Sequence, residues 1–234
     1  MQNKLINLKK FGYLKLENID LDILGVIEKK ITNAFYEAIK LSINKDLSRE
    51  KFNHFIKKKE RGSLDLDCIK ESEELSKELI SKLEIIDLAK EYWNCNKIKY
   101  SSSLSKFRYV DPNDISQIKY SPLHKDGDFF ENKESINICV PFTGYGGEYP
   151  GLQIFPLTDN KLKKKLIQKS SRFKFINLFL NSERPIVERG SYICFNQDIF
   201  HRRTIDSSNK IRINLEFRIF PNHINNPDLN LKDI

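Results

Sequence analysis

The chain has 234 residues, of which 39% are hydrophobic and 31% are charged, and its formal net charge at pH 7 is +8. This length and apolar content predict one domain, residues 1–234, with a single sizeable core. The apolar runs are too short for a signal peptide or a membrane span, which favours a cytoplasmic protein without a membrane partner. The four cysteines have neither paired nor metal-site spacing, so we expect them to be reduced: Cys68, Cys95, Cys139 and Cys194.

The positive charge is spread widely along the sequence. Its densest runs are Lys57–Lys59 with Arg61, and the basic residues between 161 and 174. Scattered lysines are typical of solvated surfaces, so the pattern argues against a nucleic-acid partner. A small substrate that bears a phosphate group stays open as an alternative.

Two segments in the first part of the chain have helical periodicity. Apolar residues recur at helical spacing through residues 20–44 and again through residues 70–93. Asp20 and Ser72 are suitable caps at their starts. We therefore expect residues 1–97 to form a mostly helical layer that packs against a sheet.

From residue 98 onward, short apolar runs alternate with turn-forming residues, which is typical of strands. This pattern predicts a mainly β fold with flanking helices, in which residues 98–222 form a two-sheet jelly-roll barrel, or double-stranded β-helix. Residues 223–234 are expected to form a C-terminal tail. The strand with Arg108 and Tyr109 is expected to line the cavity with one face, so both are candidate substrate contacts.

Two connecting segments lie near the predicted barrel mouth. The basic, amphipathic stretch 160–171 is read equally as a lid over the site or as a surface excursion. The glycine-rich segment 144–151 lacks the Lys-Ser/Thr ending of a phosphate loop and a following helix, so it predicts a turn.

Two histidines and one aspartate form the most informative pattern. His124 and Asp126 form a His-x-Asp motif, and His201 follows 75 residues after the aspartate. Two histidines and a carboxylate on one face are the ligand set of a non-heme iron(II) centre, which leaves three positions open for substrate chemistry. His-x-Asp alone is a weak signal, so the surrounding strands decide its meaning.

The last long apolar run predicts a strand with one apolar and one polar face. Apolar residues alternate strictly with polar ones from 211 to 220. The polar residues are Arg212, Asn214, Glu216 and Arg218. Taken alone, this strand favours an antiparallel sheet whose polar face is solvated.

A symmetric hairpin about residues 207–208 would give this polar face a different meaning. It would place His201 opposite Asn214, with Arg212 on the same face about 7 Å further along. That offset suits a five-carbon diacid that binds iron at one end and a guanidinium at the other.

These residues resemble a known family. The His-x-Asp motif, the run Gly-Ser-Tyr-Ile-Cys-Phe-Asn-Gln-Asp-Ile-Phe-His that ends at His201, and the arginine eleven residues later are similar to iron(II)- and 2-oxoglutarate-dependent dioxygenases. The phytanoyl-CoA dioxygenase-like branch is the most similar. The segments 11–16, 136–142 and 151–156 resemble strands of that branch and extend the resemblance over most of the chain.

The resemblance implies a set of site residues and cofactors. His124, Asp126 and His201 would be the catalytic iron(II) ligands, Arg212 would anchor 2-oxoglutarate, and Asn214 would contact its metal-bound end. Dioxygen would be the second cosubstrate, with release of succinate and CO2. The polar face expected to line the cavity, and not the resemblance, favours a small polar metabolite or a sugar-like or nucleotide-linked compound as the substrate.

The chain departs from the branch at two places. Leu157 and Thr158 stand near a position where the branch has a Ser-His pair, which argues against an acyl-CoA substrate. Arg203 stands where the branch often has a hydroxyl residue, so the resemblance gives no second partner for the distal carboxylate of 2-oxoglutarate.

Two alternative functions are weighed beside this one. Residues 212–218 also resemble the Arg-x-Asn-x-Thr-x-Arg end of the alkylation-repair dioxygenases, which demethylate nucleic-acid bases, but Glu216 stands at the threonine position. A carboxylate is unsuited to a groove that holds phosphates. The other alternative is a non-catalytic jelly-roll module whose histidines are structural or bind zinc.

Overall fold

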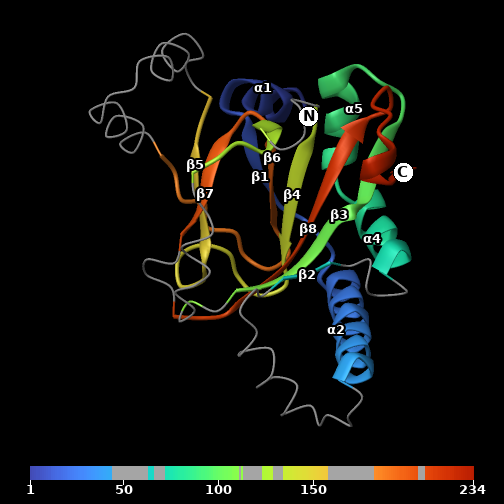
Figure 1. Ribbon diagram of the computed structural model, residues 1–234. Helices are drawn as coiled ribbons and strands as arrows, with labels where there is room; N and C mark the ends of the chain where they lie inside the picture. Colours follow the sequence, from blue (N-terminus) through green and yellow to red (C-terminus); the bar gives the residue numbers. More distant parts are fainter. Residues whose placement is uncertain are drawn as a thin grey trace.

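Two antiparallel sheets and a layer of helices make up the molecule (Figure 1). The computed structural model describes residues 1–43, 63–65, 72–110, 112, 123–128, 134–157, 182–204 and 209–234. Within these ranges the helices are α1 (Gln2–Phe11), α2 (Leu21–Ile43), α4 (Ser72–Ser81) and α5 (Ile85–Trp93), with short 3-10 turns η2 (Asp126–Asp128) and η3 (Pro227–Leu229). The strands are β1 (Tyr13–Leu16), β2 (Ser63–Asp65), β3 (Ile98–Val110), β4 (Ile136–Pro141), β5 (Gly151–Phe155), β6 (Tyr192–Asn196), β7 (Phe200–Thr204), β8 (Arg212–Pro221) and β9 (Leu231–Asp233).

The large sheet places β8 at its centre. Its strand order is β1-β6-β4-β8-β3-β2, and β9 pairs with the first part of β3 along the same edge as β2. The apolar side chains of β8, such as Leu215 and Phe217, join a core that also includes residues of α4 and α5. Its polar side chains therefore point to the other face of the sheet.

The small sheet, β5 with β7, lies against that other face (Figure 1). A second buried cluster joins the two sheets through Cys139 of β4, Ile154 of β5, and Ile193 and Phe195 of β6. The polar face of β8 is thus enclosed between two sheets, and the predicted jelly-roll fold is confirmed. The strand taken alone predicted that this polar face is solvated. That prediction is wrong, because Arg212 is only 1% exposed.

The predicted hairpin between β7 and β8 is also wrong. His201 of β7 pairs with Ile154 of β5, whereas Asn214 of β8 pairs with Arg108 of β3 and Pro141 of β4. The chain passes from the small sheet to the large one between these two strands, so a short polar break joins different sheets and not neighbours in one sheet. His201 and Arg212 still face one interior, but they reach it from opposite sheets.

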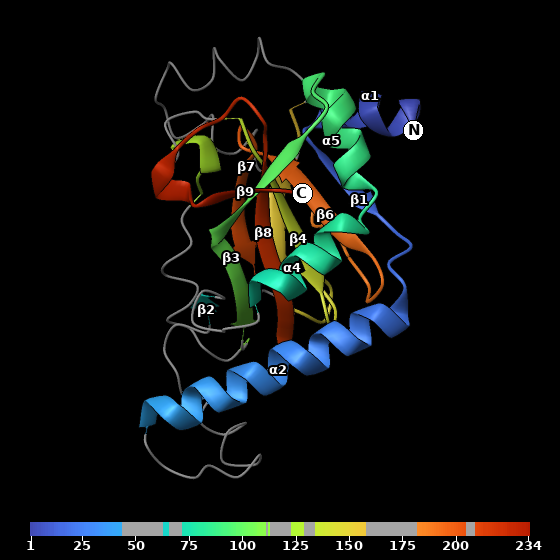
Figure 2. The ribbon, with the colours of Figure 1, turned by 90° about the vertical axis from the view of Figure 1, so that its right-hand side faces the viewer.

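Helices α4 and α5 lie on the outer side of the large sheet, and α2 crosses below the ends of its strands (Figure 2). Residues 70–93 were predicted as one helix, but the structure breaks them into α4 and α5. The end of α4 tightens, because the N–H groups of Lys82 and Leu83 donate to carbonyls three residues earlier. The chain then restarts as α5, where the Ile85 N–H donates to the buried Tyr192 hydroxyl at 3.1 Å. The helical spacing of apolar residues in the sequence shows no sign of this break, because both helices bury apolar residues in the same core.

The first strand begins later than the resemblance implied. Phe11 ends α1, a helix that the sequence did not predict, and Gly12 closes it in the left-handed conformation, with φ of 79°. A Cβ atom at this glycine would lie 2.6 Å from the side chain of Leu157, so both the conformation and the close packing require glycine. Asp20 caps α2 as predicted, because its carboxylate accepts the N–H groups of residues 22 and 23.

The last residues add to the large sheet. In the segment 223–234, η3 leads into β9, which pairs with residues 99–101 of β3. Cys139 and Cys194 are buried with free thiols, as expected, whereas Cys68, the basic run 57–61 and the stretch 160–171 lie outside the described residues. In the described part of the chain, no helix has the length and apolar character needed to cross a bilayer.

Candidate metal centre and cofactor site

Backbone pairing brings the two histidines together. The N–H of His124 donates to the carbonyl of His201 at 3.1 Å, and the reverse bond measures 2.9 Å. Asp126 follows at the start of η2, which is tied to the end of β6 because the Gly127 N–H donates to the Gln197 carbonyl at 2.9 Å. Asp126 Oδ1 lies 3.8 Å from Nε2 of each histidine, and one ligand atom from each residue lies within 4.8 Å of the others.

His201 is held with Nε2 toward this centre. Its Nδ1 lies 3.2 Å from the Ile199 carbonyl, an acceptor, so Nδ1 carries the proton and Nε2 keeps its lone pair. The ring also packs on Phe195, with 4.7 Å between ring centroids. Burial lowers the pKa of His201, although Asp126 opposes this effect. The neutral imidazole that a metal needs is therefore the favoured form.

Asp126 is oriented by two residues that sequence analysis did not assign. Arg218 Nη2 lies 2.9 Å from Asp126 Oδ2, and the Asn137 amide donates to the same oxygen at 3.3 Å. Arg218 and Asn137 are direct cross-strand partners on β8 and β4. Burial alone would raise the pKa of Asp126, but Arg218 and then the two histidines hold it below its usual value. The carboxylate is thus ionised, and Oδ1 faces the imidazoles.

Arg212 forms the opposite end of the same cavity. Its side chain is buried, Nη1 donates to the Pro150 carbonyl at 3.1 Å, and the guanidinium lies 4.5 Å from the ring centroid of Tyr145. Nε is buried and has no hydrogen-bond partner among the described residues. The turn at 144–151 supplies both contacts, so it supports this end of the cavity. An orphaned donor on a buried cation suits an anionic ligand.

Arginines also surround a partly buried glutamate between these two ends. Arg108 of β3 forms an ion pair with Glu216 of β8. Burial alone would raise the pKa of Glu216, but Arg108, Arg212 and Arg203 lower it to about 2. Burial, followed by repulsion from Arg212, lowers the pKa of Arg203 to about 10.

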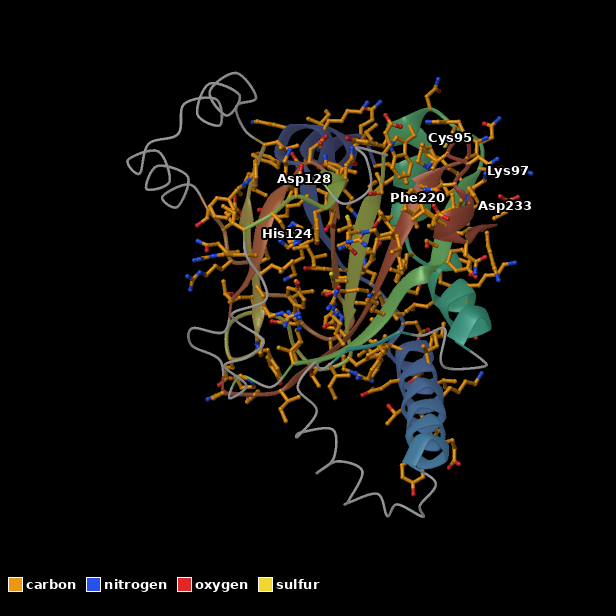
Figure 3. All side chains as sticks on the ribbon, viewed as in Figure 1. Cys95, Lys97, His124, Asp128, Phe220 and Asp233 are labelled. Carbon is orange, nitrogen blue, oxygen red and sulfur yellow. The ribbon has the colours of Figure 1, made fainter. Side chains whose placement is uncertain are left out.

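The candidate metal ligands and these arginines line one cavity of about 90 Å³. It is lined by residues of both sheets and of η2: Arg108, His124, Asp126, Asn137, Leu152, Phe195, His201, Arg203, Arg212, Glu216 and Arg218. In Figure 3 the labelled His124 and Asp128 lie on the side of the molecule occupied by β5 and β7, away from the labelled Cys95 and Lys97 beside α5. The cavity therefore lies between the sheets, away from α5.

The predicted site residues are distributed as follows. His124, Asp126, His201, Arg212 and Arg108 all line the cavity. Asn214 is fully buried but outside the cavity lining, and its amide lies 3.4 Å from Glu216 Oε1, to which it donates. Tyr109 pairs with Ile213 across β3 and β8, and its side chain lies outside the described part of the structure.

Sequence analysis gave no role to Arg218 or Asn137. The sequence did contain a signal for Arg218, because the alternation of β8 placed it on the same face as Arg212. Asn137 had none, because its role depends on the pairing of β4 with β8.

Known protein-family profiles and curated protein sequences give no match to this chain. Several solved structures are similar to this chain. EctD from S. alaskensis in its apo form aligns with a TM-score of 0.66 at 12% identity, over 99% of this chain and 84% of that chain. The non-heme alpha ketoglutarate dependent epimerase SnoN from nogalamycin biosynthesis aligns with a TM-score of 0.58 at 11% sequence identity, over 94% of this chain and 82% of that chain. AviO1 from Streptomyces viridochromogenes Tue57 aligns with a TM-score of 0.58 at 10% sequence identity, over 96% of each chain. The chain therefore has the fold of these proteins, and the likeness does not single out the phytanoyl-CoA branch.

Proposed function

We propose that this chain is an iron(II)- and 2-oxoglutarate-dependent oxygenase that hydroxylates a small polar molecule. One observation carries the proposal: a His-Asp-His cluster and a buried arginine with an orphaned donor lie in one enclosed cavity. The fold likeness supports it, because EctD has been solved with bound iron and with 2-oxoglutarate, and SnoN depends on alpha ketoglutarate.

The residues present fit the metal. Ligand atoms about 2.1 Å from one ion lie about 3 Å apart when they are at right angles. The separations of 3.8 Å between Asp126 Oδ1 and each histidine Nε2 thus need only a small inward movement. Two neutral histidines and one ionised carboxylate are the donor set expected of a non-heme iron(II) site.

The cavity also fits a diacid cosubstrate. His124, Asp126 and His201 would hold the metal at one end, and Arg212 would bind the distal carboxylate at the other. Tyr145 and the Pro150 carbonyl fix the guanidinium, so little side-chain freedom is lost on binding.

The chemistry divides between metal and protein. Bound iron(II) would supply the redox chemistry that splits dioxygen, with one oxygen atom entering succinate and the other entering the substrate as a hydroxyl group. Arg218 and Asn137 would keep Asp126 in one orientation during turnover, and the two sheets would exclude water from the reacting groups.

The test is release of labelled CO2 from 2-oxoglutarate labelled at its C1 carboxyl, with succinate measured in parallel. We expect release that requires iron(II) and dioxygen, and a loss of more than about 100-fold in Asp126→Ala. Asp128→Ala is the matched control, because Asp128 is an exposed aspartate on the same turn and lies outside the cavity lining. Release that Asp126→Ala leaves unchanged, or no iron-dependent release at all, would reject the proposal and favour a non-catalytic binding module.

A further inference from the structure

Two buried donors that lack an acceptor lie side by side at the Arg212 end of the cavity. Arg212 Nε and the Tyr145 hydroxyl are both shielded from solvent, and neither makes a hydrogen bond among the residues that the structure describes. The guanidinium lies 4.5 Å from the centroid of the Tyr145 ring, so the two side chains are in direct contact. A buried donor without an acceptor is unfavourable, and two of them on neighbouring groups indicate one shared ligand.

The Tyr145 hydroxyl is part of the cavity wall, where Tyr145 lies behind Arg212 and outside the lining itself. Burial, followed by the Cys139 thiol, raises the pKa of this hydroxyl well above its usual value, while Arg212 opposes the effect and Glu216 adds to it. The hydroxyl therefore keeps its proton and is a donor. Arg212 and Glu216 both line the cavity, so their influence places the hydroxyl close to it. A thiol is a weak hydrogen-bonding group, so Cys139 does not replace a full acceptor.

A carboxylate is the ligand that suits both donors. It has no donor of its own, offers about four acceptor positions on two oxygens, and carries the charge opposite to that of a guanidinium. A neutral carbonyl would offer one oxygen to two donors and no charge to Arg212. Sequence analysis assigned only Arg212 to the distal carboxylate of 2-oxoglutarate, so the second oxygen of that carboxylate still needs a donor.

We propose that the Tyr145 hydroxyl is the second donor to the distal carboxylate of 2-oxoglutarate, beside Arg212 Nε. This inference rests on the proposed function and adds a cosubstrate-binding residue to it. Tyr145 then has two separate roles, because its ring supports the guanidinium and its hydroxyl binds the ligand. The turn at 144–151 thus helps β8 to select a diacid.

The test measures binding and needs no turnover. Zn(II)-loaded protein is titrated calorimetrically with 2-oxoglutarate and with 2-oxovalerate, which has the same carbon chain but no distal carboxylate. Tyr145→Phe removes the hydroxyl and keeps the ring that supports Arg212, whereas Tyr145→Leu removes both. Tyr149→Phe is the matched control, because Tyr149 lies on the same turn, is partly exposed and lies outside the cavity lining.

We expect Tyr145→Phe to weaken 2-oxoglutarate binding by about tenfold or more, because a hydrogen bond to a charged group is lost. Binding of 2-oxovalerate should weaken by less than about threefold. Tyr145→Leu should weaken 2-oxoglutarate further, and Tyr149→Phe should leave both affinities unchanged. In infrared spectra of bound 2-oxoglutarate labelled with ¹³C at C5, Tyr145→Phe should shift the stretch of the distal carboxylate. Without 2-oxoglutarate, Tyr145→Phe should unfold at the same urea concentration as wild type or a higher one, because it removes a donor that has no acceptor.

Four results would overturn this inference while leaving the proposed function intact. Three concern the bound ligand: unchanged 2-oxoglutarate affinity in Tyr145→Phe, an equal loss for both ligands, or an unchanged carboxylate stretch. The fourth is a lower urea midpoint for Tyr145→Phe without 2-oxoglutarate, which would mean that the hydroxyl stabilises the fold through a partner of its own. Failure of 2-oxoglutarate to bind the Zn(II)-loaded wild type is a separate result, which would reject the proposed function and this inference with it.

Discussion

Replacing Arg212 with methionine should remove the ability to distinguish a diacid from a monoacid. The relevant pair is 2-oxoglutarate and 2-oxovalerate, which have the same five-carbon chain but differ in the distal carboxylate. Arg212 is only 1% exposed, so its bond to that carboxylate would be shielded from water. Loss of one partner of a buried charge pair costs about 2–5 kcal/mol. Because Arg203 and Arg108 stay nearby, we expect about 3 kcal/mol, or about 100-fold in affinity.

The assay is calorimetric titration of both ligands into Mn(II)-loaded wild-type and Arg212→Met protein. Affinity for 2-oxoglutarate should fall about 100-fold, whereas affinity for 2-oxovalerate should change by less than about threefold. Any general loosening of the cavity affects both ligands and cancels in the comparison. If both ligands weaken equally, Arg212 acts only by supporting Tyr145 and Pro150, and its assignment as the cosubstrate anchor is wrong.

Three further predictions concern the charges of the cavity and the packing of the fold. Arg218→Met leaves Asp126 buried without its cation, so the metal-free protein should lose about 3 kcal/mol in urea unfolding. Ni(II) should then stabilise this variant more than wild type, and equal stabilisation would contradict the ion pair. Glu216, whose folded pKa of about 2 lies below the ordinary 4.5, stabilises the fold above about pH 4.5 and loses that contribution as the pH falls toward 2. Relative to Glu216→Gln, wild type should therefore lose up to about 3 kcal/mol between about pH 5 and pH 2; parallel pH profiles would refute this. Gly12→Ala should cost about 2–3 kcal/mol, because it strains a left-handed residue and overlaps buried side chains. Gly25→Ala on α2 should be neutral or stabilising, because its Cβ would make only an ordinary contact, 3.7 Å from the Arg189 side chain; similar unfolding midpoints for the two variants would contradict both expectations.

Sequence reasoning reached the centre of the site because its signals are local. His124 and Asp126 are two residues apart, and His201 follows a strand whose burial is evident from its composition. The alternation of β8 placed Arg212 and Arg218 on one face, whatever the strand pairs with. These features do not depend on which strands pair. The candidate residues could therefore be identified even though β7 and β8 were wrongly predicted to form a hairpin.

The errors concern partners that periodicity cannot specify. A polar break of a few residues permits either a hairpin or a crossing between sheets, and only the packing of β7 on β5 decides between them. The break between α4 and α5 has the same origin, because the Tyr192 hydroxyl that receives the first N–H of α5 lies far away in sequence. The ion pair of Arg218 with Asp126 likewise joins the centre of one sheet to a turn beside the other.

The most direct test of the account is an anaerobic titration with iron(II) and 2-oxoglutarate, followed by visible absorption. We predict a weak metal-to-ligand charge-transfer band in wild type that is lost in His201→Ala. His223→Ala is the matched control, because His223 is exposed and outside the cavity lining, and it should keep the band. No band in wild type, or a band that persists without His201, would contradict an iron and 2-oxoglutarate site in this cavity.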